Sequence, residues 1–150
     1  MRSSVLVFID GTICDLTHRH ILKGTSDFEK DSEILKDVAV GDGAACMTDL
    51  AEKYDLVYIG ARSKHTADIT KTWLNNTGFP DGVVVCGGTQ GERMAAVMEL
   101  KKDIHFAAGI GDRWDDNELH LALGCMSIIL EEYNCNWNTV RKYLLNNTEA

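Results

Sequence analysis

Five short apolar segments are the feature that most constrains the fold of this chain. They span residues 4–9, 55–60, 82–86, 104–111 and 125–130. Each is apolar throughout and rich in β-branched residues, as strands covered on both faces are. Helix-like stretches separate them, at about 42–53, 64–77, 91–102, 114–123 and 136–146. This alternation predicts a parallel sheet with right-handed crossovers and helices on both faces, which is a three-layer α/β sandwich.

The loops that follow three of these strands are predicted to meet. Ligands of such sheets bind at the carboxyl ends of the strands, and DGT (10–12), GAR (60–62) and GDR (111–113) stand there. The segment from about 15 to 41 lacks a clear strand and is expected to form one or two short helices over the crevice mouth. Its charged run EKDSEILKD is interpreted as a solvated helix face. Residues 1–150 are therefore expected to be a single domain with a small helical cap segment.

Composition excludes several classes of protein. The net charge of −8 argues against a nucleic-acid groove, which needs a basic stripe. No apolar run approaches the roughly 20 residues that span a membrane, and no signal segment begins the chain. Five cysteines without a C-x-x-C pair favour reduced thiols over a disulfide framework or a zinc site. A cytoplasmic protein with neither a nucleic-acid nor a membrane partner is expected.

The three loops resemble motifs of the haloacid dehalogenase (HAD) superfamily of phosphohydrolases, over nearly the whole chain and in order. That family opens on D-x-D-G-T, in which the first aspartate attacks phosphorus and the second is the general acid. Here the window reads FIDGT, with Phe8 first and Asp10 third. The fourth motif is present as GDRWDDNE, with Asp112 and Asp116. The resemblance implies a five-stranded parallel, Rossmann-like sheet of HAD type with a minimal cap.

The departures from the family pattern concern the reacting atoms. Phenylalanine can neither attack phosphorus nor bind magnesium, and Gly60 replaces the hydroxyl residue of the second motif. The resemblance therefore implies a pseudo-phosphatase without catalytic residues, bound metal or cofactor. Lys101 or Lys102 is the loose candidate for the lysine of the third motif. A shifted register, with Asp10 as the nucleophile, is the alternative.

A second resemblance is to small phosphatase domains like that of phage polynucleotide kinase. Those domains also carry a His-Arg pair shortly after the first motif, here His18-Arg19. They share the arginine that precedes a Trp-Leu helix, here Arg62 followed by Trp73 and Leu74.

Four acids are expected to crowd one end of the crevice: Asp10, Asp112, Asp115 and Asp116. Like charges ~4 Å apart repel by about 4 kcal/mol at an effective dielectric constant near 20, so a phosphate should bind away from them. Structural roles are also open for these acids, a turn for Asp10 and helix N-caps for Asp112 and Asp116. Arg62 suits a structural ion pair with one of the crevice acids as well as ligand binding.

The residues predicted to bind a ligand combine cations with aromatic faces for a base. They are Phe8, Asp10, Thr12, His18, Arg19, Arg62, Lys64, Arg113 and Trp114. Stacking on an aromatic face is worth ~1–3 kcal/mol per base. Packing in the core is the alternative role for Phe8 and for Trp114.

These features predict a catalytically inactive HAD-like protein that binds and sequesters a phosphate-containing nucleotide. Inactive phage relatives of similar length sequester cyclic ADP-ribose signals of Thoeris immunity, so the resemblance implies a phage inhibitor acting in the host cytoplasm. One alternative is an active magnesium-dependent phosphatase acting on nucleotide or nucleic-acid 3′-phosphates. Another is a protein-binding module built on the HAD shell. A homodimer is also expected, with residues 135–147 as the candidate contact.

Overall fold

The computed structural model describes residues 2–145, and its centre is a five-stranded parallel sheet. The strand order is β5-β4-β1-β6-β7. The bounds are β1 Ser4–Phe8, β4 Asp55–Gly60, β5 Val83–Cys86, β6 Phe106–Gly111 and β7 Met126–Ile129. Each strand lies within the segment predicted for it, and every pairing is parallel. The predicted fold class is confirmed.

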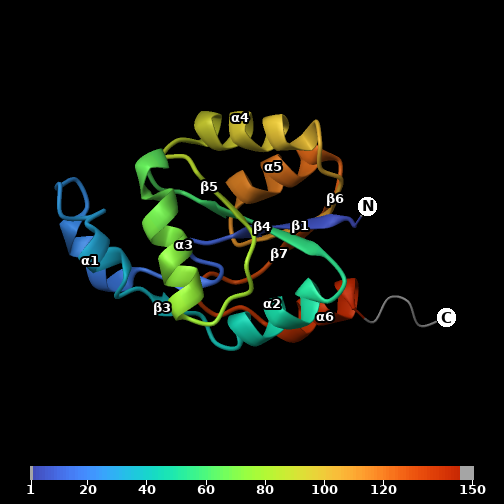
Figure 1. Ribbon diagram of the computed structural model, residues 1–150, viewed down its shortest axis with the longest axis horizontal. Coiled ribbons are helices and arrows are strands. Elements are labelled where there is room, and N and C mark those ends of the chain that lie inside the picture. The colour runs from blue at the N-terminus through green and yellow to red at the C-terminus, as the bar shows by residue number, and fades with distance from the viewer. Residues whose placement is uncertain (1, 146–150) are drawn as a thin grey trace.

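Helices cover both faces of the sheet (Figure 1). On one face lie α2 (Gly43–Ala51), α3 (Ala67–Asn76) and α6 (Trp137–Leu144), and on the other α4 (Gln90–Lys101) and α5 (Trp114–Leu123). A short 3-10 turn, η2 (Lys64–Thr66), precedes α3. The helix predicted to reach residue 146 ends at Leu144, and residue 146 lies outside the described residues.

The central strand shows why the apolar runs are continuous. Val5 and Val7 pack into the core below α2, α3 and α6, whereas Leu6 and Phe8 pack into the core below α4 and α5. Successive strand side chains point to opposite faces, so a strand covered on both faces needs apolar residues at every position. Fully burying one such side chain stabilises the fold by about 1.5–3 kcal/mol.

Local signals set the ends of the helices. Thr89 and Glu92 form a capping box at the start of α4, in which each side chain accepts a hydrogen bond from the other's backbone N–H. Gly124 closes α5 in the left-handed conformation at φ 69°, which glycine adopts at little cost.

The cap segment stands beyond the carboxyl edge of the sheet, at the left of Figure 1. It contains the 3-10 helix η1 (Thr17–Leu22) and the short helix α1 (Asp31–Ile34), in agreement with the prediction. It also contains an antiparallel pair that was not predicted, β2 (Cys14–Asp15) with β3 (Val38–Ala39). Strands of two residues are too short to leave a periodic signal. In residues 2–145, no helix has the length and apolar character needed to cross a bilayer.

Candidate functional site

Asp10 and Arg62 form an ion pair at the carboxyl edge of the sheet. Asp10 follows β1 and Arg62 follows β4, and these two strands are neighbours. Arg62 Nη2 donates to Asp10 Oδ1, and the Ala61 backbone N–H donates to Asp10 Oδ2 at 2.6 Å. Burial alone would raise the pKa of Asp10, but the charge and hydrogen bonds of Arg62, with that of Ala61, outweigh it and lower the pKa. Asp10 is therefore an anion whose charge is already compensated within the protein.

Gly60 leaves room for this arrangement of Arg62. A Cβ atom at position 60 would lie 3.1 Å from Cγ and 3.3 Å from Cδ and Nε of Arg62. The guanidinium also donates from Nη1 to Thr70 Oγ1 at 3.2 Å, so it is held from two sides. The glycine in place of a hydroxyl residue therefore allows Arg62 to fold back over β4 onto Asp10.

We expect Gly60→Ala to lower the free energy of unfolding by about 1–2 kcal/mol, because the added methyl group overpacks a buried, tethered side chain. Urea unfolding monitored by circular dichroism measures this change. Gly91→Ala is the matched control, since a Cβ there meets its nearest atom at 4.0 Å. Alanine within a helix is favoured over glycine, so the free energy of unfolding of the control should equal or exceed that of the parent. Equal stability of the Gly60→Ala variant and the parent would show that Arg62 does not need this space.

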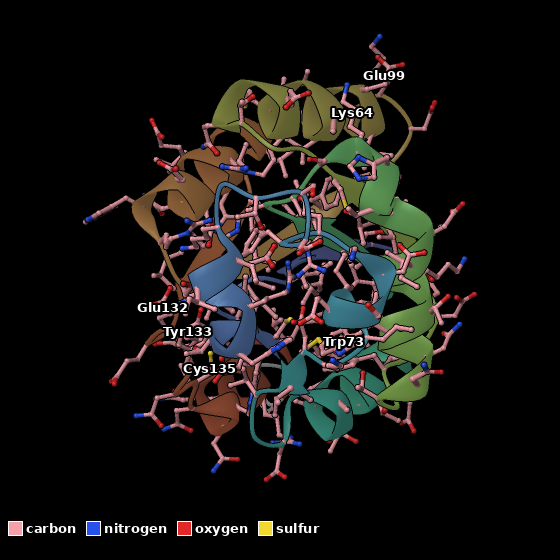
Figure 2. All side chains as sticks on the ribbon, turned by 90° about the vertical axis from the view of Figure 1, so that its left-hand side faces the viewer. Lys64, Trp73, Glu99, Glu132, Tyr133 and Cys135 are labelled. Carbon is pink, nitrogen blue, oxygen red and sulfur yellow. The ribbon has the colours of Figure 1, made fainter. Side chains whose placement is uncertain are left out.

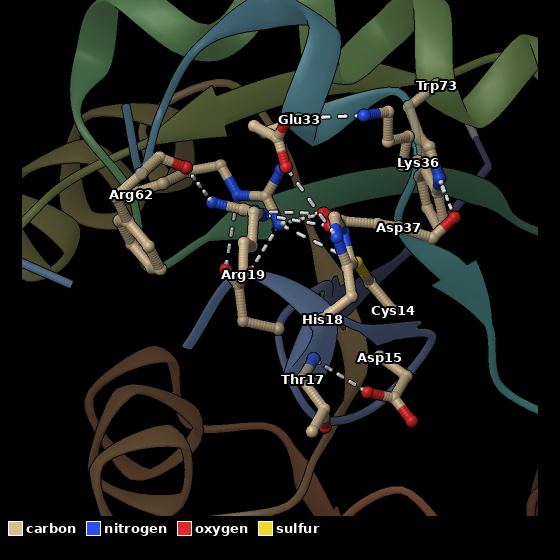
Figure 3. Close-up of polar contacts among 12 residues, drawn as sticks. Cys14, Asp15, Thr17, His18, Arg19, Glu33, Lys36, Asp37, Arg62 and Trp73 are labelled. Atoms are coloured by element: carbon tan, nitrogen blue, oxygen red, sulfur yellow. Dashed lines mark hydrogen bonds and ion pairs between the residues drawn. The ribbon is translucent and has the colours of Figure 1, made fainter. Parts of the chain in front are cut away.

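A second buried charge cluster lies beneath the cap, around Asp37 (Figure 3). The Asp37 side chain is fully buried, and the equally buried Arg19 donates to both carboxylate oxygens, at 2.8 and 2.9 Å. His18 Nε2 lies 2.7 Å from Asp37 Oδ1. The prediction that 29–37 is a solvated helix face is wrong in two respects, because the helix α1 covers only Asp31–Ile34 and because Asp37 is buried.

The two clusters are connected through Arg62. Its Nη2 atom lies 3.7 Å from Asp37 Oδ2, so Asp10, Arg62, Asp37 and Arg19 form one chain of alternating charges. The backbone carbonyl of Asp37 also accepts a hydrogen bond from Trp73 Nε1 at 2.8 Å. The cap is thus attached to the sheet and to α3 by buried polar contacts.

The loop after β6 supplies the remaining acids. Asp116 Oδ2 accepts from the backbone N–H groups of Asp112 and Arg113, at 2.9 and 3.2 Å. It therefore caps the start of α5 from the third helical position, whereas the N-cap residue itself is Arg113. Asp112 does not cap the helix; its Oδ1 accepts from Thr12 Oγ1 at 2.8 Å. Its Oδ2 is buried and has no hydrogen-bond partner among residues 2–145. Burial, with repulsion from Asp116, raises the pKa of Asp112 to about 7.

A crevice of about 430 Å³ opens between these loops and the cap. The sheet loops contribute Asp10 and Arg113, the cap contributes Lys23 and the rings of His20 and Phe28, and Tyr133 comes from the loop after β7. Tyr133 is held in place by a backbone hydrogen bond to the Gly11 carbonyl at 2.9 Å, and its hydroxyl lies 3.4 Å from His20 Nε2. Figure 2 views this end of the molecule.

Comparison with solved structures gives the architecture a name. The first of the matched chains is in the structure of a Pnkp1/Rnl/Hen1 RNA repair complex, with a TM-score of 0.68 and 13% identity over 88% of this chain. A haloacid dehalogenase-like hydrolase from Streptococcus pneumoniae matches with a TM-score of 0.63 and 11% identity, over 93% of this chain and 90% of its own. The chain has the haloacid dehalogenase fold.

The same HAD fold recurs in an enzyme from Bacteroides thetaiotaomicron, solved in complex with magnesium and inorganic phosphate. It has a TM-score of 0.62 and 14% identity, over 93% of this chain and 99% of its own. This chain spans 43% of the matched chain in the RNA repair complex. No protein-family model and no curated protein sequence matches it.

The residues present do not fit the magnesium site that the family resemblance implies. The side chain of Phe8 has no oxygen to offer, and its ring is 2% exposed in the core below α4 and α5, where it makes an edge contact with His120. Both carboxylate oxygens of Asp10 already accept hydrogen bonds from Arg62 and Ala61. In the part of the chain that the structure describes, no three His, Cys, Asp or Glu side chains group as metal ligands.

The HAD crevice contains part of the predicted ligand set. Asp10 and Arg113 line it. Arg19 and Arg62 are buried and bound to carboxylates, and His18 contacts Asp37. Thr12 is buried against Asp112, and Phe8 is a core residue.

Two predicted ligand residues lie on exposed surface. Lys64 is 4.0 Å from Glu92, and Figure 2 shows it near α4 and well apart from Tyr133. Trp114 is exposed beside Arg113, in a hollow next to the crevice.

Sequence reasoning missed other residues of the crevice. Lys23, Phe28 and Tyr133 come from irregular segments with no motif, and His20 comes from the 3-10 helix η1. The prediction of Lys101 or Lys102 as the third-motif cation is wrong by position, because both line a hollow at the start of β6, at the opposite edge of the sheet. The buried cation near the acidic loop is Arg93, in the first turn of α4, with Nη2 4.0 Å from Asp115 Oδ2.

Proposed function

We propose that this chain is a catalytically inactive HAD-like protein that binds and sequesters a phosphate-containing nucleotide in the crevice. The HAD fold is a phosphatase-family scaffold, and the observation that carries the proposal is the buried phenyl ring at position 8. The attacking carboxylate of the family belongs there, and a phenyl ring has no group that can attack phosphorus. The crevice keeps a volume and a lining suited to holding a small molecule.

The charges of the crevice favour a phosphate group. Lys23 and Arg113 line it, and neither has an ion-pair partner within the described range 2–145. Glu132 also lines it without an ion-pair partner in that range, so two cations outnumber one uncompensated acid. Asp10 is compensated by Arg62, so it opposes an anion less than a free carboxylate would. A cation ~4 Å from a phosphate contributes about 4 kcal/mol of attraction at an effective dielectric constant near 20. A phosphate is therefore expected beside Lys23 and Arg113.

The aromatic side chains of the crevice favour a nucleotide over a bare phosphate. Phe28 and Tyr133 are partly exposed on its walls, and the Phe28 ring is held under the Arg19 guanidinium at 4.7 Å. Rings fixed in this way offer stacking faces for a base. Among nucleotides we propose a cyclic ADP-ribose type of signal as the ligand, and inhibition of host Thoeris immunity by a phage protein as the biological role. This choice derives from the resemblance to inactive phage relatives.

Isothermal titration calorimetry against cyclic ADP-ribose isomers and cyclic dinucleotides tests the proposal. We expect saturable binding, with the ligand recovered unchanged by chromatography. Lys23→Glu should weaken binding at least about 10-fold, because it replaces attraction by repulsion in the crevice. Lys102→Glu makes the same charge change at the opposite edge of the sheet and should leave the affinity unchanged.

Two results would contradict the proposed function. The absence of any measurable heat of binding for every compound tested would contradict the sequestration role. Magnesium-dependent release of phosphate from an aryl phosphate, abolished by Asp10→Asn, would instead establish an active phosphatase.

A further inference from the structure

A second hollow adjoins the crevice at the same edge of the sheet. It measures about 560 Å³ and is lined by Asp112, Arg113, Trp114 and Ile129. Trp114 is the first residue of α5 and Ile129 the last residue of β7, and Gly111 at the end of β6 pairs with Ile129. The hollow thus lies over the carboxyl ends of β6 and β7, next to the loops that form the crevice.

Trp114 is exposed to an unusual degree for its type. Its residue surface is 82% exposed, whereas Trp73 is 0% and Trp137 is 5% exposed. Ile129 beside it is also exposed. Tryptophan carries the largest apolar surface of any side chain and is highly buried on average, so an exposed indole in a concave apolar site points to an occupant.

Arg113 connects the two spaces, because its side chain lines both the crevice and the hollow. Phe28 and Tyr133 line the crevice, and Trp114 lines the hollow. Each space also has an acid in its lining, Glu132 in the crevice and Asp112 in the hollow. A cation between two aromatic sites matches a ligand whose anionic group lies between two ring systems.

We propose that the crevice and the Trp114 hollow are two base subsites for one ligand, a dinucleotide whose two nucleosides are joined by a diphosphate. The diphosphate lies at Arg113, one base enters the crevice, and the other stacks on Trp114 against Ile129. This inference rests on the proposed function, since it requires that the crevice bind nucleotides. It adds a second base site outside the crevice. It also names a different class of ligand, because a two-base dinucleotide would occupy both spaces, whereas a one-base cyclic ADP-ribose would occupy the crevice alone.

Two matched ligands distinguish a protein that binds one base from a protein that binds two. Diadenosine diphosphate and ADP-ribose carry the same diphosphate and the same charge, and ADP-ribose lacks the second adenine. We expect diadenosine diphosphate to bind about 10-fold more tightly or better, as stacking of one additional base implies. In Trp114→Ala the two affinities should become equal, whereas Trp114→Phe should keep most of the difference.

Tryptophan fluorescence reports the same event without relying on affinity. Trp114 is the exposed indole and the other two are buried, so iodide quenching of the parent reports mainly on Trp114, with Trp114→Phe as the baseline. Diadenosine diphosphate should protect Trp114 from iodide, and ADP-ribose should protect it less.

Each other outcome has a definite meaning. Equal affinities with Trp114 still quenchable would overturn the second subsite while leaving nucleotide binding in the crevice intact. No binding of either compound would overturn both proposals. Protection of Trp114 that rises with protein concentration in the absence of nucleotide would assign the hollow to self-association and overturn the inference.

Discussion

Replacing Asp37 by alanine is expected to lower the free energy of unfolding by about 3–5 kcal/mol, because removing one partner of a buried ion pair leaves the other charge uncompensated. Asp37 accepts two hydrogen bonds from Arg19, which is fully buried, and lies close to Arg62 and His18. Urea unfolding at neutral pH measures the effect. The cap and the loop of Asp10 should lose protection from hydrogen exchange together, since both are attached to this cluster.

Two variants control for general effects of mutation at position 37. Glu99→Ala removes an exposed ion pair with Lys102 and should change stability by no more than about 0.5 kcal/mol. The double variant Arg19→Met with Asp37→Leu replaces the pair by apolar groups and should be more stable than Asp37→Ala alone. A loss below about 1 kcal/mol in Asp37→Ala would mean that the cluster does not hold the cap.

The second large effect is a loss of stability in acid that depends on His120. This ring is fully buried, packs over Gly109, and has one nitrogen 2.7 Å from Ser127 Oγ. Burial lowers the pKa of His120 to about 4. The folded protein therefore keeps the ring neutral, while the unfolded chain takes up a proton near pH 6.5. Stability contributed by the neutral ring is present above that pH and is lost as the pH falls toward 4.

The expected loss from this group is about 3 kcal/mol between pH 6.5 and pH 4, from about 1.4 kcal/mol per unit of pKa difference. Urea unfolding of the parent and His120→Asn across that range measures it. The variant should be less stable than the parent at neutral pH, because packing is lost. The difference in free energy of unfolding between the two proteins should become smaller in acid, because only the parent loses the contribution of the neutral ring. His105→Asn, at an exposed position, should keep a constant difference from the parent. A constant gap for His120→Asn as well would show that the ring becomes charged without unfolding.

The fold could be predicted because its signals are local and repeated. Each strand is a continuous apolar run, and a helix-like stretch separates each run from the next. The alternation of strands and helices then leaves few topologies. Asp10, Arg62 and Arg113 could be placed at one edge because each follows such a strand.

The rest of the site could not be predicted, because irregular backbone supplies it. Lys23, Phe28 and Tyr133 meet in the crevice through turns that have no periodicity. Asp37 lies in a highly charged run that has the composition of solvated surface, and its burial depends on Arg19 and Arg62 arriving from other elements. Arg62 has room because residue 60 is a glycine. The need for a glycine there is evident only from the structure, in which the Arg62 side chain folds back over residue 60.

The chain of alternating charges from the cap to Asp10 also restricts how this sequence can evolve. Each member is neutralised by the next, so loss of any one exposes a neighbour to the full cost of an unpaired charge in the interior. Two of these positions can change together. A single change lowers the stability of the protein, so it can persist only where substitutions elsewhere have already raised that stability. Among homologues, the identities at positions 10, 19, 37 and 62 should therefore be inherited as a block, even where the surface of the cap diverges freely.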